Sequence, residues 1–340
     1  MTIGVTQPIR FIQIGVGNRG AQILQDLLAQ SDNRFEPVAF VDTNPDHLAA
    51  AVARHGLTDL PTYDDLAIAL AAHADATAVV IVSPARFHGA MTQTALLAGK
   101  DVWIEKPLTY DYAEAQALAL LARQQQRVVV IGNQYQYHPL ERQLQQLLRE
   151  EHYGKPFFIS YLHHRHRPEM RAFTGEYPAL WEQGVHSLNS ILALLDNPDL
   201  QTVYATALRP PHSQYNSDTV TNLLTTFANG VQAHLLVTFD SQHSDWVLRV
   251  ECEHAALLLQ AEGWERRTIQ VLRGEQVIDR IGPHEICDPA QRDPYGAFYI
   301  AVMTGALTPT SIEVNLKTIQ WIDAAVQSLR TGNVVRIEAN

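Results

Sequence analysis

The chain has 340 residues; 46% are hydrophobic, enough for a sizeable core, and only 18% are charged, which excludes a disordered polyelectrolyte. Its formal net charge is −11 and it contains no block of Lys and Arg, so nucleic acid and anionic membrane surfaces are poor candidates as partners. At about 150 residues per domain, this length predicts two domains.

The beginning of the chain and its cysteines bear on location. The stretch 1–17 lacks a basic segment followed by a long apolar one, so no signal peptide is expected. Apolar runs such as 78–82 are far shorter than the ~20 residues that span a bilayer. The two cysteines, Cys252 and Cys287, predict no disulfide framework. These features together predict a cytoplasmic protein that does not enter a membrane.

Short apolar segments alternate with helical ones over residues 1–131. Strands that are apolar throughout are typical of parallel sheets buried on both faces. Their alternation with helices predicts a doubly wound α/β domain. Strands are expected at 10–15, 37–42, 60–63, 78–83, 102–105 and 127–131, and helices at 21–31, 45–55, 64–74, 88–99 and 111–125.

Consecutive strand patterns dominate from residue 132 onward, and Asn229-Gly230 is a typical hairpin turn between two of them. This pattern predicts an α+β domain over 132–340 with a largely antiparallel sheet, and the helix 315–331 is expected to pack back on the first domain. The expected strands are 157–163, 202–208, 219–227, 231–238, 247–252, 256–260, 268–272 and 277–281, and the expected helices are 139–151, 182–195, 291–305 and 315–331.

A glycine-rich turn, Gly15-Val16-Gly17-Asn18-Arg19-Gly20, lies between the first expected strand and its helix. In this context GxGxxG is typical of dinucleotide binding, because the glycines permit a tight turn and close approach of a pyrophosphate. The helix N-terminus then offers free N–H groups to the phosphates. We expect Gly15, Gly17, Asn18, Arg19 and Gly20 to contact the cofactor; a turn without ligand is the alternative.

Asp42 ends the second expected strand, 22 residues after Gly20. A carboxylate at this place accepts hydrogen bonds from the ribose hydroxyls of NAD and repels the 2′-phosphate of NADP. Thr43 and Asn44 follow it rather than an arginine, so NAD is expected over NADP. A turn or capping aspartate is the alternative.

Lys106, in Glu105-Lys106-Pro107, follows the fifth expected strand. Ligands of open α/β sheets bind beyond the carboxyl ends of the strands. Partial burial beside a positively charged nicotinamide would lower the lysine pKa toward ~7–8, where it exchanges protons with a substrate hydroxyl. A solvated surface lysine is the alternative.

Several motifs resemble one known family: GVGNRG, VDTNP, TYDDL, VIVSPARFH, LLAGKDVWIEKPLT and RTGNVVRI. They are similar to those of the glucose–fructose oxidoreductase / inositol 2-dehydrogenase / rhizopine catabolism (Gfo/Idh/MocA) family, over nearly the whole chain. The resemblance implies an NAD-binding Rossmann domain, a second domain with an open sheet, and assembly into a homodimer or homotetramer that covers this sheet. It also implies cofactor contacts from Ser83, Pro84, His88, Glu105, Lys106 and Asn133.

The segment from Glu182 to Asn189 resembles a second signature of this family, D-x-G-x-H-x-x-D at the start of a helix. Glu182, His186 and Asn189 have spacings that place them on one face of an α-helix. The resemblance implies that Lys106, Glu182 and His186 form the catalytic group. His186 would take the hydroxyl proton, Lys106 would hold or relay to the oxygen, and the acid would orient its partner. A satisfied helix histidine and a simple helix charge are the alternatives for His186 and Glu182.

Three departures from the family pattern stand out. Glu182 and Asn189 replace the two usual aspartates, and the segment 132–139, where many relatives carry an arginine, is uncharged. One extra methylene moves a carboxylate by about a bond length, and catalysis is sensitive to displacements of ~1 Å. These changes predict either an unusual substrate or lost activity.

The run His163-His164-Arg165-His166-Arg167 suggests a metal site at first sight. On a strand, however, its histidines fall on both faces, and zinc needs further ligands that no motif supplies, so no metal is expected. A face of this strand either lines the substrate cleft or forms a polar interface. The residues expected to meet substrate are Lys106, Tyr135, His164, Arg167, Glu182, His186, Asn189 and, more loosely, Tyr295.

The sequence therefore predicts an NAD(P)-dependent dehydrogenase acting on CH–OH groups. It would transfer hydride between nicotinamide and a secondary alcohol of a cyclic polyol, sugar or sugar derivative. One alternative within this family is a glycosidase that retains its NAD; another is a sensor that binds NAD without catalysis, which the departures at Glu182 and Asn189 favour.

Overall fold

Two compact units make up the protein. The first comprises Met1–Gly132 and Asp288–Val314, and the second comprises Asn133–Cys287 and Asn315–Asn340. The sequence analysis also divides the chain near residue 131. It assigns residues 288–314 to the second domain, however, whereas they belong to the first unit. The computed structural model describes residues 7–30, 33–169, 175–262, 268–283 and 293–338.

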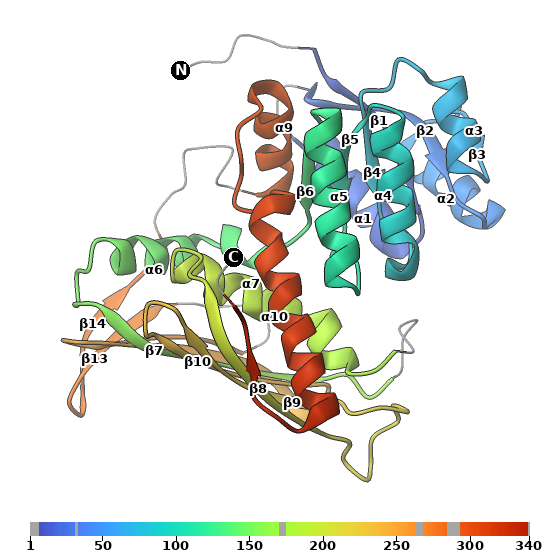
Figure 1. Ribbon diagram of the computed structural model, residues 1–340. Coiled ribbons are helices and arrows are strands. Elements are labelled where there is room, and N and C mark those ends of the chain that lie inside the picture. The colour runs from blue at the N-terminus through green and yellow to red at the C-terminus, as the bar shows by residue number, and fades with distance from the viewer. Residues whose placement is uncertain (1–6, 31–32, 170–174, 263–267, 284–292, 339–340) are drawn as a thin grey trace. The chain divides into compact units, whose positions relative to one another are not determined.

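The first unit contains a six-stranded parallel sheet with the order β3-β2-β1-β4-β5-β6 (Figure 1). This is the strand order of a doubly wound Rossmann sheet, so the predicted fold class is confirmed for this unit. The strands are β1 (Ile9–Ile14), β2 (Phe35–Val41), β3 (Thr62–Tyr63), β4 (Ala78–Ile81), β5 (Asp101–Ile104) and β6 (Val129–Ile131). The helices are α1 (Asn18–Leu28), α2 (Pro45–His55), α3 (Leu66–Ala72), α4 (His88–Leu97), α5 (Tyr112–Gln125) and α9 (Pro294–Thr304).

An aromatic cluster explains why α9 belongs to the first unit. Phe298 of α9 stacks on Phe35 of β2 with ring centroids 6.4 Å apart, and Phe11 of β1 meets Phe35 edge-on. All three rings are buried. The sequence shows α9 as an apolar helix but does not indicate which sheet it covers, so its partner strands could not be predicted.

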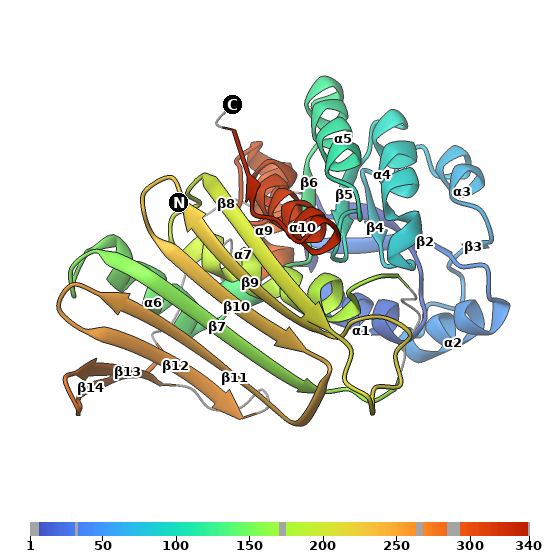
Figure 2. The same ribbon diagram turned by 60° about the horizontal axis from the view of Figure 1, so that its bottom comes forward.

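The second unit contains a nine-stranded sheet with the order β14-β13-β12-β11-β7-β10-β9-β8-β15 (Figure 2). Among the described strands of this sheet, only β7 and β10 pair in parallel, so the predicted, largely antiparallel sheet is confirmed. The turn at Asn229-Gly230 joins β9 and β10 as expected. The strands are β7 (Pro156–His166), β8 (Leu200–Leu208), β9 (Val220–Phe227), β10 (Gln232–Thr238), β11 (Asp240–Cys252), β12 (Ala256–Glu262), β13 (Ile269–Arg273), β14 (Gln276–Ile281) and β15 (Val335–Arg336).

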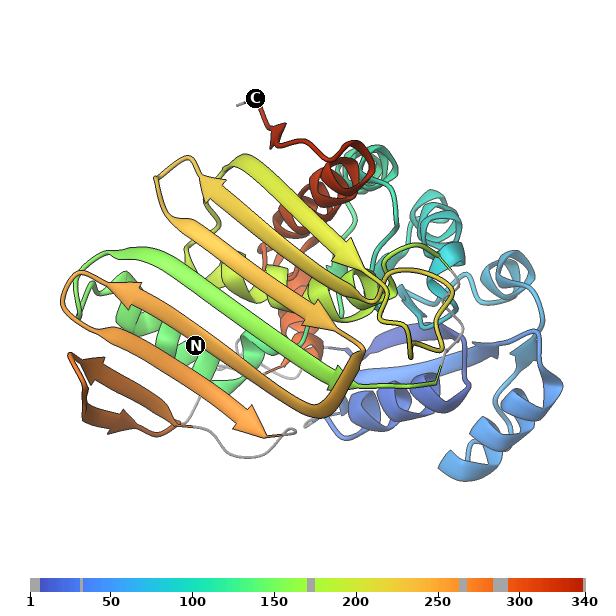
Figure 3. The same ribbon diagram turned by 90° about the horizontal axis from the view of Figure 1, so that it is seen from below.

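Helices cover one face of this second sheet. Trp321 of α10 (Ile312–Thr331) donates its indole N–H to Thr225 Oγ1 of β9 over 2.7 Å and packs on the Phe227 ring. Figure 3, viewed from below, shows the opposite face, on which the described residues place no helix. That α10 also packs on the first unit stays a prediction. The other elements are η3 (Tyr135–Tyr137), α6 (Pro139–Arg149), the π-turn η4 (Leu180–Gly184) and α7 (Val185–Leu194).

Candidate functional site

Sterics explain the glycine-rich turn after β1. Gly15 has φ +83°, and a Cβ there would lie 2.5 Å from the Val82 carbonyl oxygen. A Cβ on Gly20 would lie 2.0 Å from the Gly15 carbonyl oxygen. The buried amide of Gln13 donates to the Gly20 carbonyl over 2.9 Å and to that of Gly15 over 3.2 Å. The sequence analysis missed Gln13, whose side chain holds the turn closed.

The turn leaves the start of α1 open to an anion. Gly17 is the N-cap of α1, and no side chain caps the helix there. A Cβ on Gly17 would meet only the tip of the His47 ring, at 3.3 Å. The first N–H groups of the helix thus have no side-chain cap and lie at its positive dipole end, which suits a pyrophosphate. These residues fit a dinucleotide, and exposed Asn18 lies at the same helix end.

Asp42 follows β2 and already serves the turn. Its Oδ2 accepts the Val16 N–H over 3.0 Å, and its Oδ1 accepts the Asn44 N–H over 2.9 Å. His47 Nδ1 approaches Oδ2 to 3.3 Å; the sequence analysis did not single out this histidine. A carboxylate has about four lone-pair sites, so Asp42 can also accept from ribose hydroxyls.

Glu105 follows β5 and pairs with Arg19. Nε and Nη2 of Arg19 donate to Glu105 Oε1 over 2.8 and 2.6 Å, and Lys106 N–H donates to Oε2 over 2.9 Å. Burial lowers the pKa of the Arg19 guanidinium, but the Glu105 carboxylate raises it further, and the net direction is upward. Two predicted cofactor residues thus hold each other, and the half-buried Lys106 follows directly.

His88 connects the ends of two strands. Its Nδ1 lies 2.7 Å from the Pro107 carbonyl oxygen and its Nε2 lies 2.8 Å from the Ser83 carbonyl oxygen. Burial lowers the pKa of His88, while the two carbonyl contacts oppose that effect. Both ring nitrogens already face protein atoms, so His88 supports the segments around Ser83, Pro84 and Lys106 rather than offering a ring nitrogen to a cofactor.

These groups share one edge of the parallel sheet. The turn follows β1, Asp42 follows β2, Ser83 follows β4 and Glu105-Lys106 follows β5. The carboxyl ends of parallel strands meet at the same edge, and ligands of such sheets bind there. The first unit thus brings most of the predicted cofactor residues together.

In the second unit, β7 directs alternate side chains toward α7 and η4. His163 Nδ1 lies 3.1 Å from Ser187 Oγ, and Arg165 Nη1 donates to Gln183 Oε1 over 3.2 Å. Burial lowers the pKa of His163 to about 3, so this histidine is neutral near pH 7. The sequence analysis did not single out His163 or Arg165 as site residues. The alternation of side chains along a strand shows which residues share a face, but it does not show which helix that face contacts.

Arg167 and Glu182, both predicted to meet substrate, form an ion pair. Arg167 Nη1 lies 2.5 Å from Glu182 Oε2, and both side chains are mostly buried. The Arg167 guanidinium also lies over the Phe239 ring. Glu182 belongs to the π-turn rather than to a regular α-helix. Its side chain therefore points in a different direction around the helix axis, relative to His186, than regular α-helical spacing predicts. The longer glutamate side chain reaches Arg167, which directly follows β7.

His186 lies in a column of stacked rings. Tyr135 stacks on His186 with centroids 4.5 Å apart and planes 13° apart. Tyr135 also stacks on His163, and His163 stacks on Tyr161. Gln183 Nε2 donates to the Tyr135 hydroxyl over 2.7 Å. The structure therefore brings two predicted site residues, Tyr135 and His186, into direct contact.

Asn189 is buried in a network of amides. Gln136 Nε2 donates to Asn189 Oδ1 over 2.7 Å, and Asn189 Nδ2 donates to Asn315 Oδ1 and Thr318 Oγ1, each over 3.3 Å. Asn133, predicted to meet cofactor, donates to the same Asn315 oxygen. Two departures from the family pattern, the uncharged 132–139 segment and Asn189, thus form one hydrogen-bonded pair.

We expect Asn189→Asp to lower the free energy of unfolding by about 2 kcal/mol. The new carboxylate would face the Asn315 oxygen, and burial would leave its charge uncompensated. Adding Gln136→Arg should recover most of this loss by pairing the charges, as in a double-mutant cycle. Urea unfolding of the wild type, both single variants and the double variant measures the coupling. Strictly additive effects would contradict this account.

Two predicted substrate residues have other partners. Tyr295 of α9 is buried, donates its hydroxyl to Asp26 Oδ2 over 3.1 Å and stacks on Trp103. Burial raises the pKa of Tyr295. This corrects its assignment as a substrate residue, since it belongs to the aromatic core of the first unit. His164 Nδ1 lies 2.7 Å from Asp245 Oδ1 of β11, on the sheet face opposite His163.

Comparison with known proteins covers both units. Residues 9–133 match the family model of oxidoreductases with an NAD-binding Rossmann fold, and residues 142–258 match that of the GFO/IDH/MocA C-terminal domain. Over 146 residues, 43% of this chain, the sequence is 32% identical to the UDP-N-acetylglucosamine 3-dehydrogenase of Acidithiobacillus ferrooxidans. The chain spans only about two fifths, 42%, of that relative's length.

Solved structures match the fold over nearly the whole chain. The WlbA dehydrogenase of Bordetella pertussis, crystallised with NADH and UDP-GlcNAcA, gives a TM-score of 0.82 at 18% identity, covering 98% of this chain and 100% of that one. The aldose–aldose oxidoreductase of Caulobacter crescentus gives 0.83 at 18% identity, covering 97% and 100%. With both domains matched, the chain belongs to the GFO/IDH/MocA family of NAD-binding Rossmann oxidoreductases.

Proposed function

We propose that this protein is a dehydrogenase that transfers hydride between NAD and a secondary alcohol of a sugar, cyclic polyol or sugar derivative. One observation carries the proposal. The open N-terminus of α1, Asp42 and Lys106 lie at the same edge of one parallel sheet. This edge offers phosphate donors, a ribose acceptor and a proton-exchanging amine at the place where such sheets bind their ligands.

The residues of the chain divide the work in this proposal. The first N–H groups of α1 hold the pyrophosphate and Asp42 accepts the ribose hydroxyls. A bound nicotinamide supplies the hydride acceptor. In the roles that the family resemblance implies, His186 of the second unit takes the proton of the substrate hydroxyl, and Lys106 Nζ of the first unit donates a hydrogen bond to the substrate. Glu182 holds Arg167 in place by their ion pair.

The names of similar proteins favour carbohydrate substrates. One is a UDP-N-acetylglucosamine dehydrogenase, and another was crystallised with a nucleotide-linked sugar acid. The polar side chains of Arg165, Arg167 and His186 suit an oxygen-rich substrate. Nucleotide-linked sugars therefore belong in the test beside free sugars.

The test is NADH formation with NAD at mildly alkaline pH, using inositols, hexoses, sugar acids, amino sugars and nucleotide-linked sugars. Alkaline pH favours the deprotonated base and draws alcohol oxidation forward. We expect absorbance at the NADH band with one of these classes. NAD that stays bound through purification, with no net NADH on any substrate, would overturn the proposal in favour of a retained-cofactor enzyme or a sensor.

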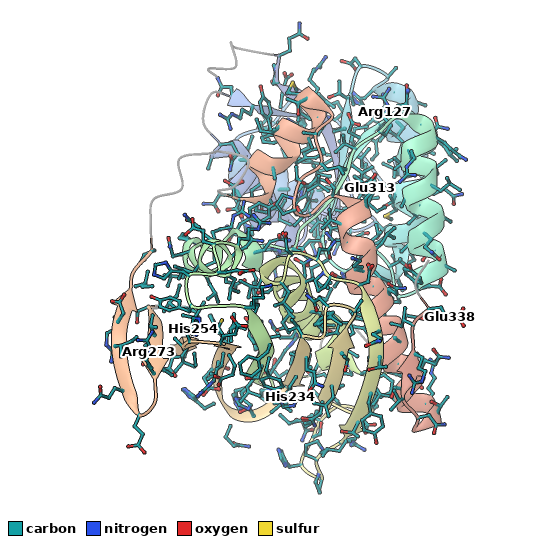
Figure 4. All side chains as sticks on the ribbon, turned by 60° about the vertical axis from the view of Figure 1, so that its left-hand side comes forward. Arg127, His234, His254, Arg273, Glu313 and Glu338 are labelled. Atoms are coloured by element: carbon teal, nitrogen blue, oxygen red, sulfur yellow. The ribbon has the colours of Figure 1, made fainter. Side chains whose placement is uncertain are left out.

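We also propose that a second copy of the chain covers the open face of the nine-stranded sheet. Leu208 and Leu224 on this face are 52% and 54% exposed, and Leu224 lies beside Tyr204 across the β8–β9 pair. His234 of β10, labelled in Figure 4, lies beside Leu224 across the β9–β10 pair. Exposed apolar patches of this kind mark association surfaces. Light scattering of the purified protein measures the number of subunits.

Among the residues that the structure describes, no helix combines the length and apolar character needed to cross a bilayer.

A further inference from the structure

The hydroxyl of Tyr135 belongs to a chain of directed hydrogen bonds. A guanidinium only donates, so the contact of Arg165 Nη1 with Gln183 Oε1, at 3.2 Å, fixes the orientation of the Gln183 amide. Gln183 Nε2 must then be the donor in its 2.7 Å contact with the Tyr135 hydroxyl oxygen. The Tyr135 oxygen is therefore an acceptor within the protein, and its own hydrogen points away from Gln183.

This chain makes Tyr135 a stronger donor than an isolated phenol. Its first member is cationic, and successive hydrogen bonds of this kind polarise one another in a buried setting. Tyr135 and Gln183 are 8% and 5% exposed, so water screens the chain little. Hydrogen bonding to the phenol oxygen stabilises negative charge there, which strengthens the remaining O–H as a hydrogen-bond donor.

The Tyr135 ring also stacks on His186, the residue that we propose as the general base. The centroids of Tyr135 and His186 are 4.5 Å apart, and their planes differ by 13°. His163, which is neutral near pH 7, also stacks on Tyr135, with ring centroids 6.1 Å apart. Tyr135 thus contacts two imidazole rings, and its hydroxyl oxygen is held by Gln183.

We propose that Tyr135 donates its hydroxyl hydrogen to the substrate oxygen from which His186 removes the proton. This inference rests on the proposed function. The substrate O–H bond breaks, its proton goes to His186, and the oxygen carries negative charge until the carbonyl forms. Tyr135 stabilises that charge and keeps its own proton, so the balance of the reaction is unchanged. Donors aimed at a developing oxyanion contribute about 10²–10³ in kcat.

Two tyrosine-to-phenylalanine variants within the stacked rings test the role of the Tyr135 hydroxyl in turnover. Tyr135→Phe keeps the stack and removes the hydroxyl, and we expect kcat to fall about 10²-fold or more with a smaller change in KM. Tyr161→Phe removes the other hydroxyl of the same column, outside the Arg165–Gln183 chain, and is expected to retain kcat. Equal kcat values for the two variants would overturn the proposal.

A second measurement needs neither substrate nor NAD. Tyrosines labelled with ¹³C are titrated by NMR in the apo protein, with Tyr135→Phe and Tyr161→Phe assigning the signals. Gln183→Met should raise the pKa of Tyr135 and leave that of Tyr161 unchanged, because the donor to the Tyr135 phenolate is lost. An unchanged Tyr135 pKa would overturn the hydrogen-bond chain whatever the enzyme does. A wild type without turnover that still shows this shift would sink the proposed function instead.

Discussion

Replacing Lys106 by methionine is expected to lower kcat by about 10²–10⁴-fold while NAD binding persists. The methionine keeps much of the apolar stem but removes the amine that would hydrogen-bond the substrate oxygen. The backbone N–H of residue 106 still donates to Glu105, so the Arg19–Glu105 pair should survive. Initial rates of NADH formation and calorimetric NAD titration measure the two effects separately.

Lys106→Arg is the matched control for charge. An arginine keeps the positive charge but does not exchange its proton near neutral pH, so it should restore substrate affinity more than kcat. If Lys106→Met retained the wild-type kcat, the role assigned to Lys106 would be wrong. If both variants lost NAD binding, the lysine would serve the cofactor rather than the substrate.

Alanine at Gly17 and at Gly20 should have opposite consequences. At Gly20 the new Cβ would lie 2.0 Å from the Gly15 carbonyl oxygen, so we expect a loss of unfolding free energy of ~3 kcal/mol or more. At Gly17 it would meet only the His47 side chain at 3.3 Å, so the fold should survive. The added methyl would occupy the pyrophosphate's approach, and NAD binding should weaken about tenfold or more, ~1.4 kcal/mol.

Thermal unfolding and NAD titration of the same two variants check this contrast. Gly56→Ala serves as a control for a glycine with positive φ and no neighbour within 4 Å, where only backbone strain acts. A Gly17→Ala protein with unimpaired NAD affinity would show that the cofactor does not approach this turn.

The elements were predictable where the signal is local. Apolar runs and helical spacing gave all six strands of the first sheet, and even the weak 60–63 segment is present as β3. The GxGxxG spacing predicted the turn because part of its constraint is local: a Cβ on Gly20 would meet the Gly15 carbonyl oxygen, five residues earlier. Asp42 followed from its distance to the turn, a local measure as well.

The site's pairings were not predictable, because they join residues far apart in the chain. Tyr135 meets Gln183 across 48 positions, and Asn189 meets Asn315 across 126. No spacing rule connects such positions. The π-turn also escaped, since one added residue in a helix leaves no mark in composition, yet it changes the direction of Glu182.

Asp42 has two tasks in this account: its carboxylate holds the glycine-rich turn through Val16, and it is the proposed acceptor for the ribose hydroxyls. These two tasks limit how the cofactor preference can change. In the role proposed for Asp42, its carboxylate repels a 2′-phosphate, so acceptance of NADP would require its removal. The same oxygen, however, ties the Val16 N–H to the end of β2. A substitution of Asp42 therefore also releases the glycine turn to which we assign the phosphates. An evolutionary or engineered switch at this position therefore needs a second residue that recaptures Val16, and single-site exchanges should yield a weak binder of both dinucleotides.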